Sequence, residues 1–139
     1  MALTARYLAD KSALARFPHP AVKRRLRPLL EDGWIATCGI VDLEVLYSAR
    51  DLDDYEATLQ ERRALEDVPV TPQVVSKAVE IQHDLARRGQ HRIPIPDLLI
   101  AAAADSAGLT VLHYDSDFEL ISEVSDVSQE WVVPRGRAN

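Results

Sequence analysis

The chain has 139 residues, of which 27% are charged and 47% hydrophobic, and its 22 acidic and 16 basic residues give a formal net charge of −6. This length and composition are typical of one globular domain with an ordinary apolar core, and they exclude disordered and fibrous chains. The single cysteine, Cys38, excludes an internal disulfide and a cysteine-based zinc cluster, while the acidic balance disfavours a nucleic-acid partner.

No internal repeat, low-complexity tract or long linker divides the chain, so we expect residues 1–139 to form a single domain. The first six residues lack the apolar stretch of a signal peptide. The longest apolar run, Leu98–Ala104, is far shorter than the roughly 20 residues that span a bilayer. We therefore expect a cytoplasmic protein without a membrane segment.

The first half of the chain predicts strands that alternate with helices. Short apolar runs have the character of strands, and the segments after them show apolar residues at helical spacing. Ser12 is expected to cap the first helix, and the helix from Gly39 is apolar almost all the way round, which predicts that it is mostly buried. The expected strands are Tyr7–Ala9 and Trp34–Thr37, and the expected helices are Ser12–Phe17, Ala21–Leu30 and Gly39–Ala49.

The second half continues the alternation. An exposed helix is expected first, then a strand that Pro69 restricts to an edge of the sheet, then an amphipathic helix. The residues expected near the inner side of this helix are Val75, Val79, Ile81, Gln82 and Leu85. Ser116 and Glu119 have capping-box spacing before a last short helix. The expected helices are Leu52–Glu66, Pro72–Arg88, Leu98–Ala107 and Ser116–Val124, and the expected strands are Val68–Val70, Thr110–His113 and Val127–Val133.

Strands separated by helices imply parallel pairing with helices on both faces of the sheet. The predicted fold class is α/β, a three-layer domain with a central, mainly parallel sheet of four to five strands flanked by helices.

Four acids fall where such a sheet binds ligands, beyond the carboxyl ends of its strands. Asp10 and Asp115 follow the first and fourth strands, Asp97 opens the helix before the fourth strand, and Glu44 can lean back toward the same edge from its apolar helix. Each aspartate could instead cap a helix, whereas a carboxylate in an apolar helix needs a partner, a proton or a cation. Converging carboxylates repel one another, and oxygen-only ligands favour Mg²⁺ or Mn²⁺, so the residues predict a metal-assisted phosphodiester or phosphoryl site.

Four segments together resemble, in order and spacing, the PIN domain of VapC-type toxin ribonucleases. The resemblance runs from about Tyr7 to Phe118, most of the chain. The segments are Tyr7-Leu-Ala-Asp10-Lys-Ser12-Ala-Leu14, Glu44-Val-Leu-Tyr47-Ser48, Pro96-Asp97-Leu-Leu-Ile-Ala-Ala102 and Thr110-Val-Leu-His-Tyr-Asp115-Ser-Asp117-Phe118.

The resemblance implies a single PIN domain over residues 1–139 and endonucleolytic cleavage of RNA, in which a metal-activated water attacks a backbone phosphate. It implies that Asp10, Glu44, Asp97 and Asp115 bind Mg²⁺ or Mn²⁺. It makes Asp117 a further acid that contacts metal or water, and Ser12 a hydroxyl that supports the acidic site. Lys11 stands where the family commonly has Thr, at a variable position. The resemblance also implies an antitoxin partner that occludes the site, and a homodimer.

Two groups of basic residues could meet the RNA. Arg87, Arg88, His91 and Arg92 precede Asp97 and could contact RNA or the antitoxin. The densest basic cluster could be an RNA-contact surface or simply a solvated helix face. Its members are Lys23, Arg24, Arg25 and Arg27.

Two other functions remain open on sequence alone. An aspartyl-phosphate phosphatase or receiver-like domain also places an aspartate after its first strand, although a haloacid-dehalogenase-like phosphatase would carry a second aspartate where this chain has Ser12. A non-catalytic PIN-like module would bind RNA or a partner without cleavage, and its signature would be the loss of acids that this chain retains.

Overall fold

The computed structural model describes residues 3–139, which form a five-stranded, all-parallel sheet in the order β3-β2-β1-β4-β5. The predicted α/β class and parallel pairing are confirmed. The strands are β1 Tyr7–Ala9, β2 Ile35–Cys38, β3 Glu66–Val68, β4 Thr110–His113 and β5 Gln129–Trp131. The helices are α1 Lys11–Leu14, α2 Pro20–Glu31, α3 Gly39–Tyr47, α4 Leu52–Arg63, α5 Pro72–Ala86, α6 Ile95–Ser106 and α7 Asp117–Glu123.

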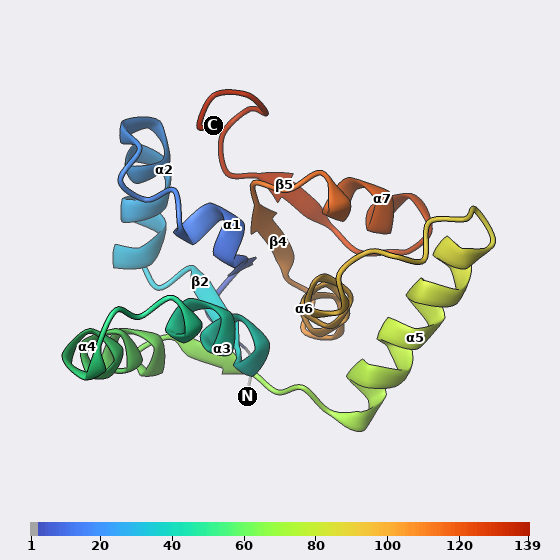
Figure 1. The fold of residues 1–139 in the computed structure, drawn as a ribbon, viewed down its shortest axis with the longest axis horizontal. Helices are drawn as coiled ribbons and strands as arrows, with labels where there is room; N and C mark the ends of the chain where they lie inside the picture. Colours follow the sequence, from blue (N-terminus) through green and yellow to red (C-terminus); the bar gives the residue numbers. More distant parts are fainter. Residues whose placement is uncertain (1–2) are drawn as a thin grey trace.

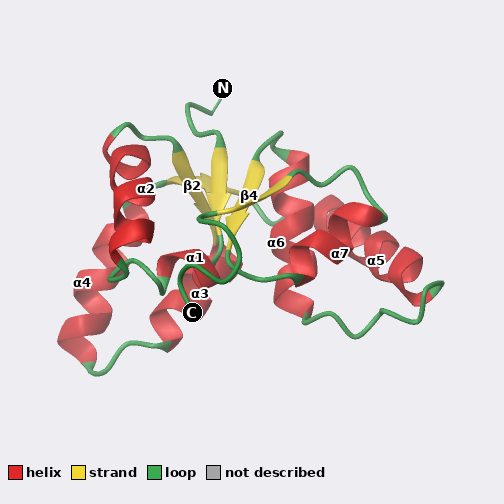
Figure 2. Ribbon diagram, turned by 90° about the horizontal axis from the view of Figure 1, so that it is seen from above, coloured by secondary structure: helices red, strands yellow, loops and turns green. Residues whose placement is uncertain are grey.

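Helices cover both faces of this sheet (Figures 1 and 2). On one face α6 packs between α3 and α5, and α7 packs against α6. On the other face α1 and α2 enclose a second apolar cluster, which includes Leu26 and the C-terminal Ala138. The chain therefore has the three layers that the alternation of strands and helices predicts.

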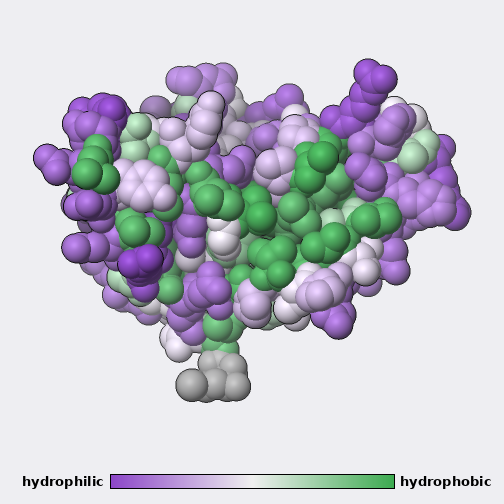
Figure 3. Space-filling model, turned by 60° about the horizontal axis from the view of Figure 1, so that its bottom comes forward, coloured by the Kyte–Doolittle hydropathy of each residue, from purple (hydrophilic) through white to green (hydrophobic). Residues whose placement is uncertain are grey.

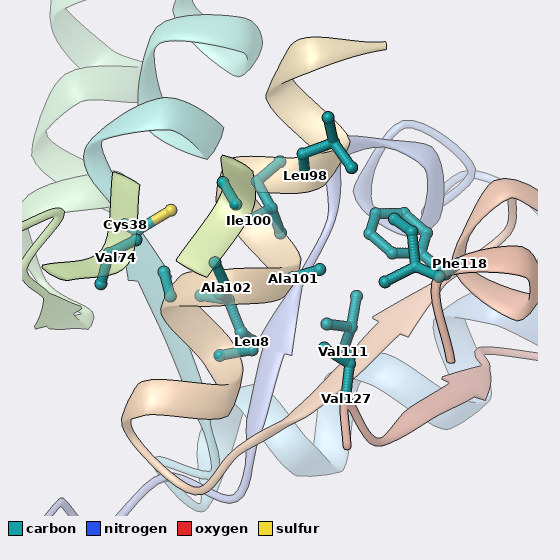
Figure 4. Close-up of a cluster of buried hydrophobic side chains, with 14 of the residues drawn as sticks. Leu8, Cys38, Val74, Leu98, Ile100, Ala101, Ala102, Val111, Phe118 and Val127 are labelled. Carbon is teal, nitrogen blue, oxygen red and sulfur yellow. The ribbon is translucent and has the colours of Figure 1, made fainter. Parts of the chain in front are cut away.

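The run of small residues in α6 explains how closely this helix approaches the sheet. Ala101 and Ala102 are fully buried, and Figure 4 shows them near Leu8 of β1 and Val111 of β4. Gly108, with φ of +70°, turns the chain from α6 into β4 in a conformation that disfavours other residues. The first turn of α6 is thereby held at the carboxyl edge of the central strands.

The structure corrects several expected helix starts. The first helix begins at Lys11 and is capped by Asp10, whose Oδ2 accepts the Ser12 N–H at 3.0 Å, so Ser12 is not the cap. Ser116 stands at the N-cap of α7, but its side chain makes no capping hydrogen bond. Instead Asp115 Oδ1 accepts the Asp117 N–H at 2.9 Å, which leaves the capping box unformed.

Two helices expose apolar residues that we expected to be buried. In α3 only Val41 and Leu46 are buried, while Leu43 is 65% and Tyr47 88% exposed. In α5 the expected inner residues Ile81 and Leu85 are buried, but Val75 and Val79 face outward, and Val74 and Ala78 are buried in their place. The reason is that α3 packs against α6, α4 and β2, and α5 packs against α6 and α7, and each helix leaves one side without a neighbouring element. Among residues 3–139, no helix is long and apolar enough to cross a membrane.

Candidate metal centre

The acids gather where the strand order reverses. β1 and β4 are neighbours in the sheet, but their connections leave toward opposite sides, and such a switch point leaves a crevice at the carboxyl ends of the strands. Asp10 directly follows β1, and Asp115 lies just beyond β4. Asp97 stands in the first turn of α6, where the helix dipole favours a negative charge.

Asp97, Asp115 and Asp117 form the compact part of the site. One carboxylate oxygen of each lies within 4.8 Å of the other two, close enough for one ion to contact all three. Asp97 is buried, while Asp115 and Asp117 are half-buried. Asp117 is thus a full member of the cluster, a position that the sequence pattern left less certain.

Glu44 and Asp10 border this cluster. The charges of both raise the pKa of Asp97, and the charge of Asp10 raises the pKa of Glu44. Glu44 points inward from α3 although both residues beside it in the chain are partly or largely exposed. Asp10, Glu44 and Asp115 are thus close enough to Asp97 for their charges to act on it.

Burial and the repulsion of neighbouring charges oppose the ionisation of Asp97, Asp117 and Glu44. Burial, and then the charges of Asp10, Asp115, Asp117 and Glu44, raises the pKa of Asp97 to about 8. Burial and the charge of Asp115 raise the pKa of Asp117, while a hydrogen bond with Asp97 acts in the opposite direction. Burial also raises the pKa of Glu44, and the nearby Lys11 offsets this in part. A cation in the cluster would remove the conflict.

Two buried oxygens of the site, Glu44 Oε1 and Asp97 Oδ2, have no hydrogen-bond partner within residues 3–139. Leaving a buried acceptor unpaired costs about 1–3 kcal/mol, and more for a charged group. Both atoms belong to carboxylates in an oxygen-only donor set, which is the set that hard divalent cations prefer. The residues present therefore fit a metal ion.

Hydrogen bonds position the two strand-end acids. Ser12 Oγ accepts the Tyr114 N–H at 2.9 Å, which ties the start of α1 to the end of β4. His113 is fully buried, and its Nδ1 accepts the Asp115 N–H at 3.1 Å. Its Nε2 lies 2.6 Å from Gln129 Oε1, so the ring is the neutral tautomer that donates from Nε2. His113 is thus a buried, hydrogen-bonded histidine that holds the backbone of Asp115 in place.

A second polar cluster stands apart from the acids and was missed at the sequence level. Arg62 of the supposedly exposed α4 is buried, and it donates from Nε to Asp42 Oδ1 at 2.9 Å and from Nη2 to Thr37 Oγ1 at 2.6 Å. Asp42 is thereby directed away from Glu44, as the helical geometry of α3 requires. No signal in the charged sequence of α4 distinguishes Arg62 from its neighbours.

The four basic residues before Asp97 lie at the end of α5 and in the loop that follows, and all are exposed. Arg88 pairs with Glu123 at 3.3 Å, and Arg87 lies 4.0 Å from Asp84. His91 and Arg92 make no ion pair among the described residues. The structure does not bring these side chains into hydrogen-bond contact with any described acid of the cluster, so their contact role stays a prediction.

Comparisons with known proteins agree with this geometry. The profile of the PIN domain family matches residues 7–124. Ribonuclease VapC21 of Mycobacterium tuberculosis is 49% identical over 138 residues, covering 98% of this chain and all of that protein. Ribonuclease VapC51 of the same species is 44% identical over 131 residues, covering 94% of this chain and 96% of that protein.

Solved structures show the same fold. A DNA-bound VapBC complex from Salmonella typhimurium contains a chain that superposes with a TM-score of 0.71 at 18% identity, covering 94% of this chain and all of that one. FitAcB from Neisseria gonorrhoeae superposes with a TM-score of 0.67 at 21% identity, covering 88% and 95% of the two chains. The domain match and the near full-length identity to two ribonucleases place this chain in the PIN domain family, among the VapC ribonucleases.

Proposed function

We propose that this protein is the toxin of a toxin-antitoxin pair and acts as a metal-dependent endoribonuclease through its carboxylate cluster. The observation that carries the proposal is the convergence of Asp97, Asp115 and Asp117 at the switch point, with unpaired buried oxygens on Asp97 and Glu44. The ribonuclease names of its relatives support the same activity. The cation we propose is Mg²⁺ or Mn²⁺, because the donors are all carboxylate oxygens.

In this proposal Asp10, Glu44, Asp97 and Asp115 are the principal ligands, and Asp117 is a further one. A divalent ion held there would offset charge on the scissile phosphate and lower the pKa of a water molecule that attacks it. The Ser12 N–H donates to Asp10, and the Ser12 hydroxyl accepts the Tyr114 N–H beside Asp115. Ser12 therefore ties the end of β1 to the end of β4 and helps to hold Asp10 and Asp115 at a fixed separation.

The two alternatives find no support in the site. The second aspartate of a haloacid-dehalogenase-like phosphatase is replaced by Ser12, whose hydroxyl is used to bind the Tyr114 backbone. A non-catalytic module would have no need to keep the acids, whereas this chain retains all four, and Asp97 and Asp115 converge with Asp117. Cleavage of RNA is therefore the function that the geometry supports best.

We further propose an antitoxin partner, a homodimer and a cytoplasmic location. Solved neighbours with this fold are complexes described as VapBC toxin-antitoxin systems, which supports a partner of that kind. Arg87, Arg88, His91 and Arg92 remain candidates for contact with that partner or with RNA. We also propose that residues 1–139 form one domain, since β5 and the C-terminal residues pack against β4 beyond the matched range.

An exposed apolar surface supports the homodimer. Val75 and Val79 of α5 and Ile95 of α6 line a groove of about 300 Å³ and are each at least 46% exposed. Leu43 and Tyr47 of α3 are exposed as well, and Figure 3 shows hydrophobic side chains spread over the face of the molecule that carries α3, α6 and α5. A second copy of the chain is the occupant we propose for this surface.

The proposed activity is tested by incubating the purified protein with RNA and Mn²⁺ or Mg²⁺, with and without EDTA. Asp10→Asn and Glu44→Gln should each lower the cleavage rate by about 100-fold or more, because even the groups behind metal ligands are worth 10- to 100-fold. Asp53→Asn, which changes an exposed acid of α4, is the matched control and should cleave normally. Undiminished cleavage by both site variants, or cleavage that EDTA leaves intact, would contradict the proposal.

A further inference from the structure

The acidic site lies beside a surface of opposite charge. Helix α2 carries Lys23, Arg24, Arg25 and Arg27 against a single acid, Glu31, although the whole chain is acidic. The C-terminal residues 132–139 add Arg135 and Arg137 and contain no acidic side chain. We call these residues of α2 and of the C-terminal segment the basic surface.

The two parts of the basic surface meet in an open hollow of about 590 Å³. Arg24 and Arg25 line it from α2, and Trp131 and Pro134 line it from β5 and the C-terminal segment. Arg25 is committed to the fold, since it pairs with Glu130 at 3.2 Å and donates to the Val132 carbonyl. Arg24 is exposed and forms no ion pair among residues 3–139, so its charge is available to a ligand.

The C-terminal segment is held in place rather than loose. The Tyr114 hydroxyl accepts the N–H groups of Gly136 at 2.7 Å and Ala138 at 3.0 Å, and it donates to Asn139 Oδ1 at 2.8 Å. Arg16 Nε donates to the Ala138 carbonyl at 3.0 Å. In Figures 1 and 2 the segment leaves β5 and ends beside α2 and α1.

The segment also presents its two arginines outward. The Arg135 side chain is 70% exposed, lies over the Trp131 ring and comes no nearer than 4.0 Å to the Glu119 carboxylate. Arg137 is exposed and forms no ion pair among the described residues. Because hydrogen bonds to its backbone hold the segment, the points from which these two side chains extend are fixed before any ligand arrives.

The anchors of this segment are the same residues that position the acids. Tyr114 precedes Asp115 in the chain, and its N–H donates to Ser12 Oγ. Arg16 Nη1 donates to the Ser12 carbonyl at 2.8 Å, and the Ser12 N–H donates to Asp10. The anchors of the C-terminal segment therefore lie next to Asp10 and Asp115, at the ends of β1 and β4.

We infer that the basic surface binds the sugar-phosphate backbone of the single-stranded RNA that enters the acidic site, with Arg24, Arg135 and Arg137 as phosphate contacts. The inference rests on the proposed ribonuclease function and adds the path of the substrate. Its warrant is charge complementarity, because a carboxylate cluster repels a polyanion and a flanking cationic track offsets that repulsion. The bases are not read here by stacking, because Trp131 packs against His113 and Tyr114.

The test measures the binding of a labelled single-stranded RNA of about 20 nucleotides by fluorescence anisotropy, with Mn²⁺ and over a series of salt concentrations. The full chain is used in an Asp97→Asn background, which prevents cleavage under the proposed function. Replacing Arg24, Arg135 and Arg137 together by Gln should weaken binding by about 10-fold or more. The slope of log affinity against log salt should fall by about 2, since each contact with single-stranded nucleic acid contributes roughly 0.7.

The control removes three charges elsewhere, by replacing Arg6, Arg50 and Arg63 with Gln, and it should leave the salt slope within about half a unit of its starting value. All three are exposed: Arg6 directly precedes β1, Arg50 lies just before α4, and Arg63 is the last residue of α4. Equal losses in both triple variants would overturn the inference, because net charge alone would then explain them. Unchanged RNA binding by the variant of Arg24, Arg135 and Arg137 would overturn the inference too. This holds even if that variant no longer binds a protein partner, because the surface would then serve the partner and not RNA. Failure of the ribonuclease proposal would show separately, as normal cleavage by the acid variants.

Discussion

The fold opposes the ionisation of Asp97 more than solvent would. Its carboxylate is buried, one of its oxygens has no partner, and four other acids repel its charge. In the folded protein its pKa is raised to about 8 from an ordinary value of 3.8. Between these two pH values the folded protein holds a proton that the unfolded chain has released, and stability is therefore linked to pH.

Without metal, the stability that Asp97 contributes is complete below about pH 4 and is lost as the pH rises through about 8. In EDTA we expect the free energy of unfolding to fall across this range with a slope of up to about 1.4 kcal/mol per pH unit. Asp97→Asn should flatten the slope and be more stable than the unaltered protein at pH 8. Urea unfolding at several pH values measures this.

Mn²⁺ supplies the complementary check on the same residue. It should stabilise the unaltered protein most at pH 8, since binding to the folded state adds stability by mass action, and it should stabilise Asp97→Asn much less. Asp53→Asn serves as the control acid and should retain the pH slope. A slope that persists in Asp97→Asn would show that other groups cause it.

At this scale the sequence predicts the acids well, because strand ends and helix starts can be located from apolar patterns. Asp10, Asp97 and Asp115 needed only the positions of β1, β4 and α6, and Glu44 was marked by its apolar neighbours. The backing of Asp115 by His113 could not be predicted, because it depends on a rotamer and on Gln129 of another strand. The anchoring of the C-terminal segment by Tyr114 depends likewise on contacts between distant residues.

At the scale of elements, the buried side chain of Arg62 joins two helices and a strand. Arg62 of α4 binds Asp42 of α3 and Thr37 of β2, and its side chain is 8% exposed. Removing one partner of such a pair leaves the other charge buried without compensation, which costs more than the pair contributes. This cluster therefore fixes how α4 sits against the start of α3, the helix that carries Glu44.

Arg62→Met should lower the free energy of unfolding by about 3 kcal/mol, the lower end of the usual range because the Asp42 side chain is 25% exposed. Arg63→Met, at the exposed neighbouring position, should change it by less than about 0.5 kcal/mol. Urea denaturation of both variants gives the comparison. Equal, small effects would mean that the pair contributes nothing that water cannot replace.

The sequence predicts which strands and helices form more reliably than it predicts which side of each helix is buried. Each expected strand is present in the parallel sheet. β2 begins one residue later than expected, β3 begins two residues earlier, and β5 is shorter than its expected range. The burial expected of most of α3 was wrong, and in α5 Val75 and Val79 were wrong while Ile81 and Leu85 were right, because apolar periodicity alone does not show which apolar residues find a neighbouring element. The outward-facing Val79 and Tyr47 are the residues on which that assumption failed.

At the scale of the whole molecule, the net charge of −6 takes on a different meaning. Four of the negative charges belong to the proposed ligands Asp10, Glu44, Asp97 and Asp115, and two divalent ions would neutralise them. Basic residues are concentrated on α2 and the C-terminal segment. The acidity that first disfavoured a nucleic-acid partner is thus partly the proposed catalytic site itself, and RNA binding should depend on the metal.

The exposed apolar surface of α3, α5 and α6 borders that site. Leu43 is next to Glu44 in the chain, and Ile95 is two residues before Asp97, so a second copy seated there would lie close to the acidic site. Val79, 59% exposed, lines the groove between α5 and α6. A charge introduced at this position would have to be desolvated when the second copy binds.

We therefore expect the unaltered protein to elute with the mass of two chains in size-exclusion chromatography with light scattering, and Val79→Glu to elute with the mass of one. Leu52→Glu is the matched control, because Leu52 is 69% exposed on α4 and does not line the groove between α5 and α6. Circular dichroism should show that both variants keep their helical content, since neither side chain is part of the core. A dimer that survives Val79→Glu, or one that Leu52→Glu disrupts, would place the interface elsewhere. If the unaltered protein is a monomer, a second copy does not cover this surface and the proposed homodimer is wrong.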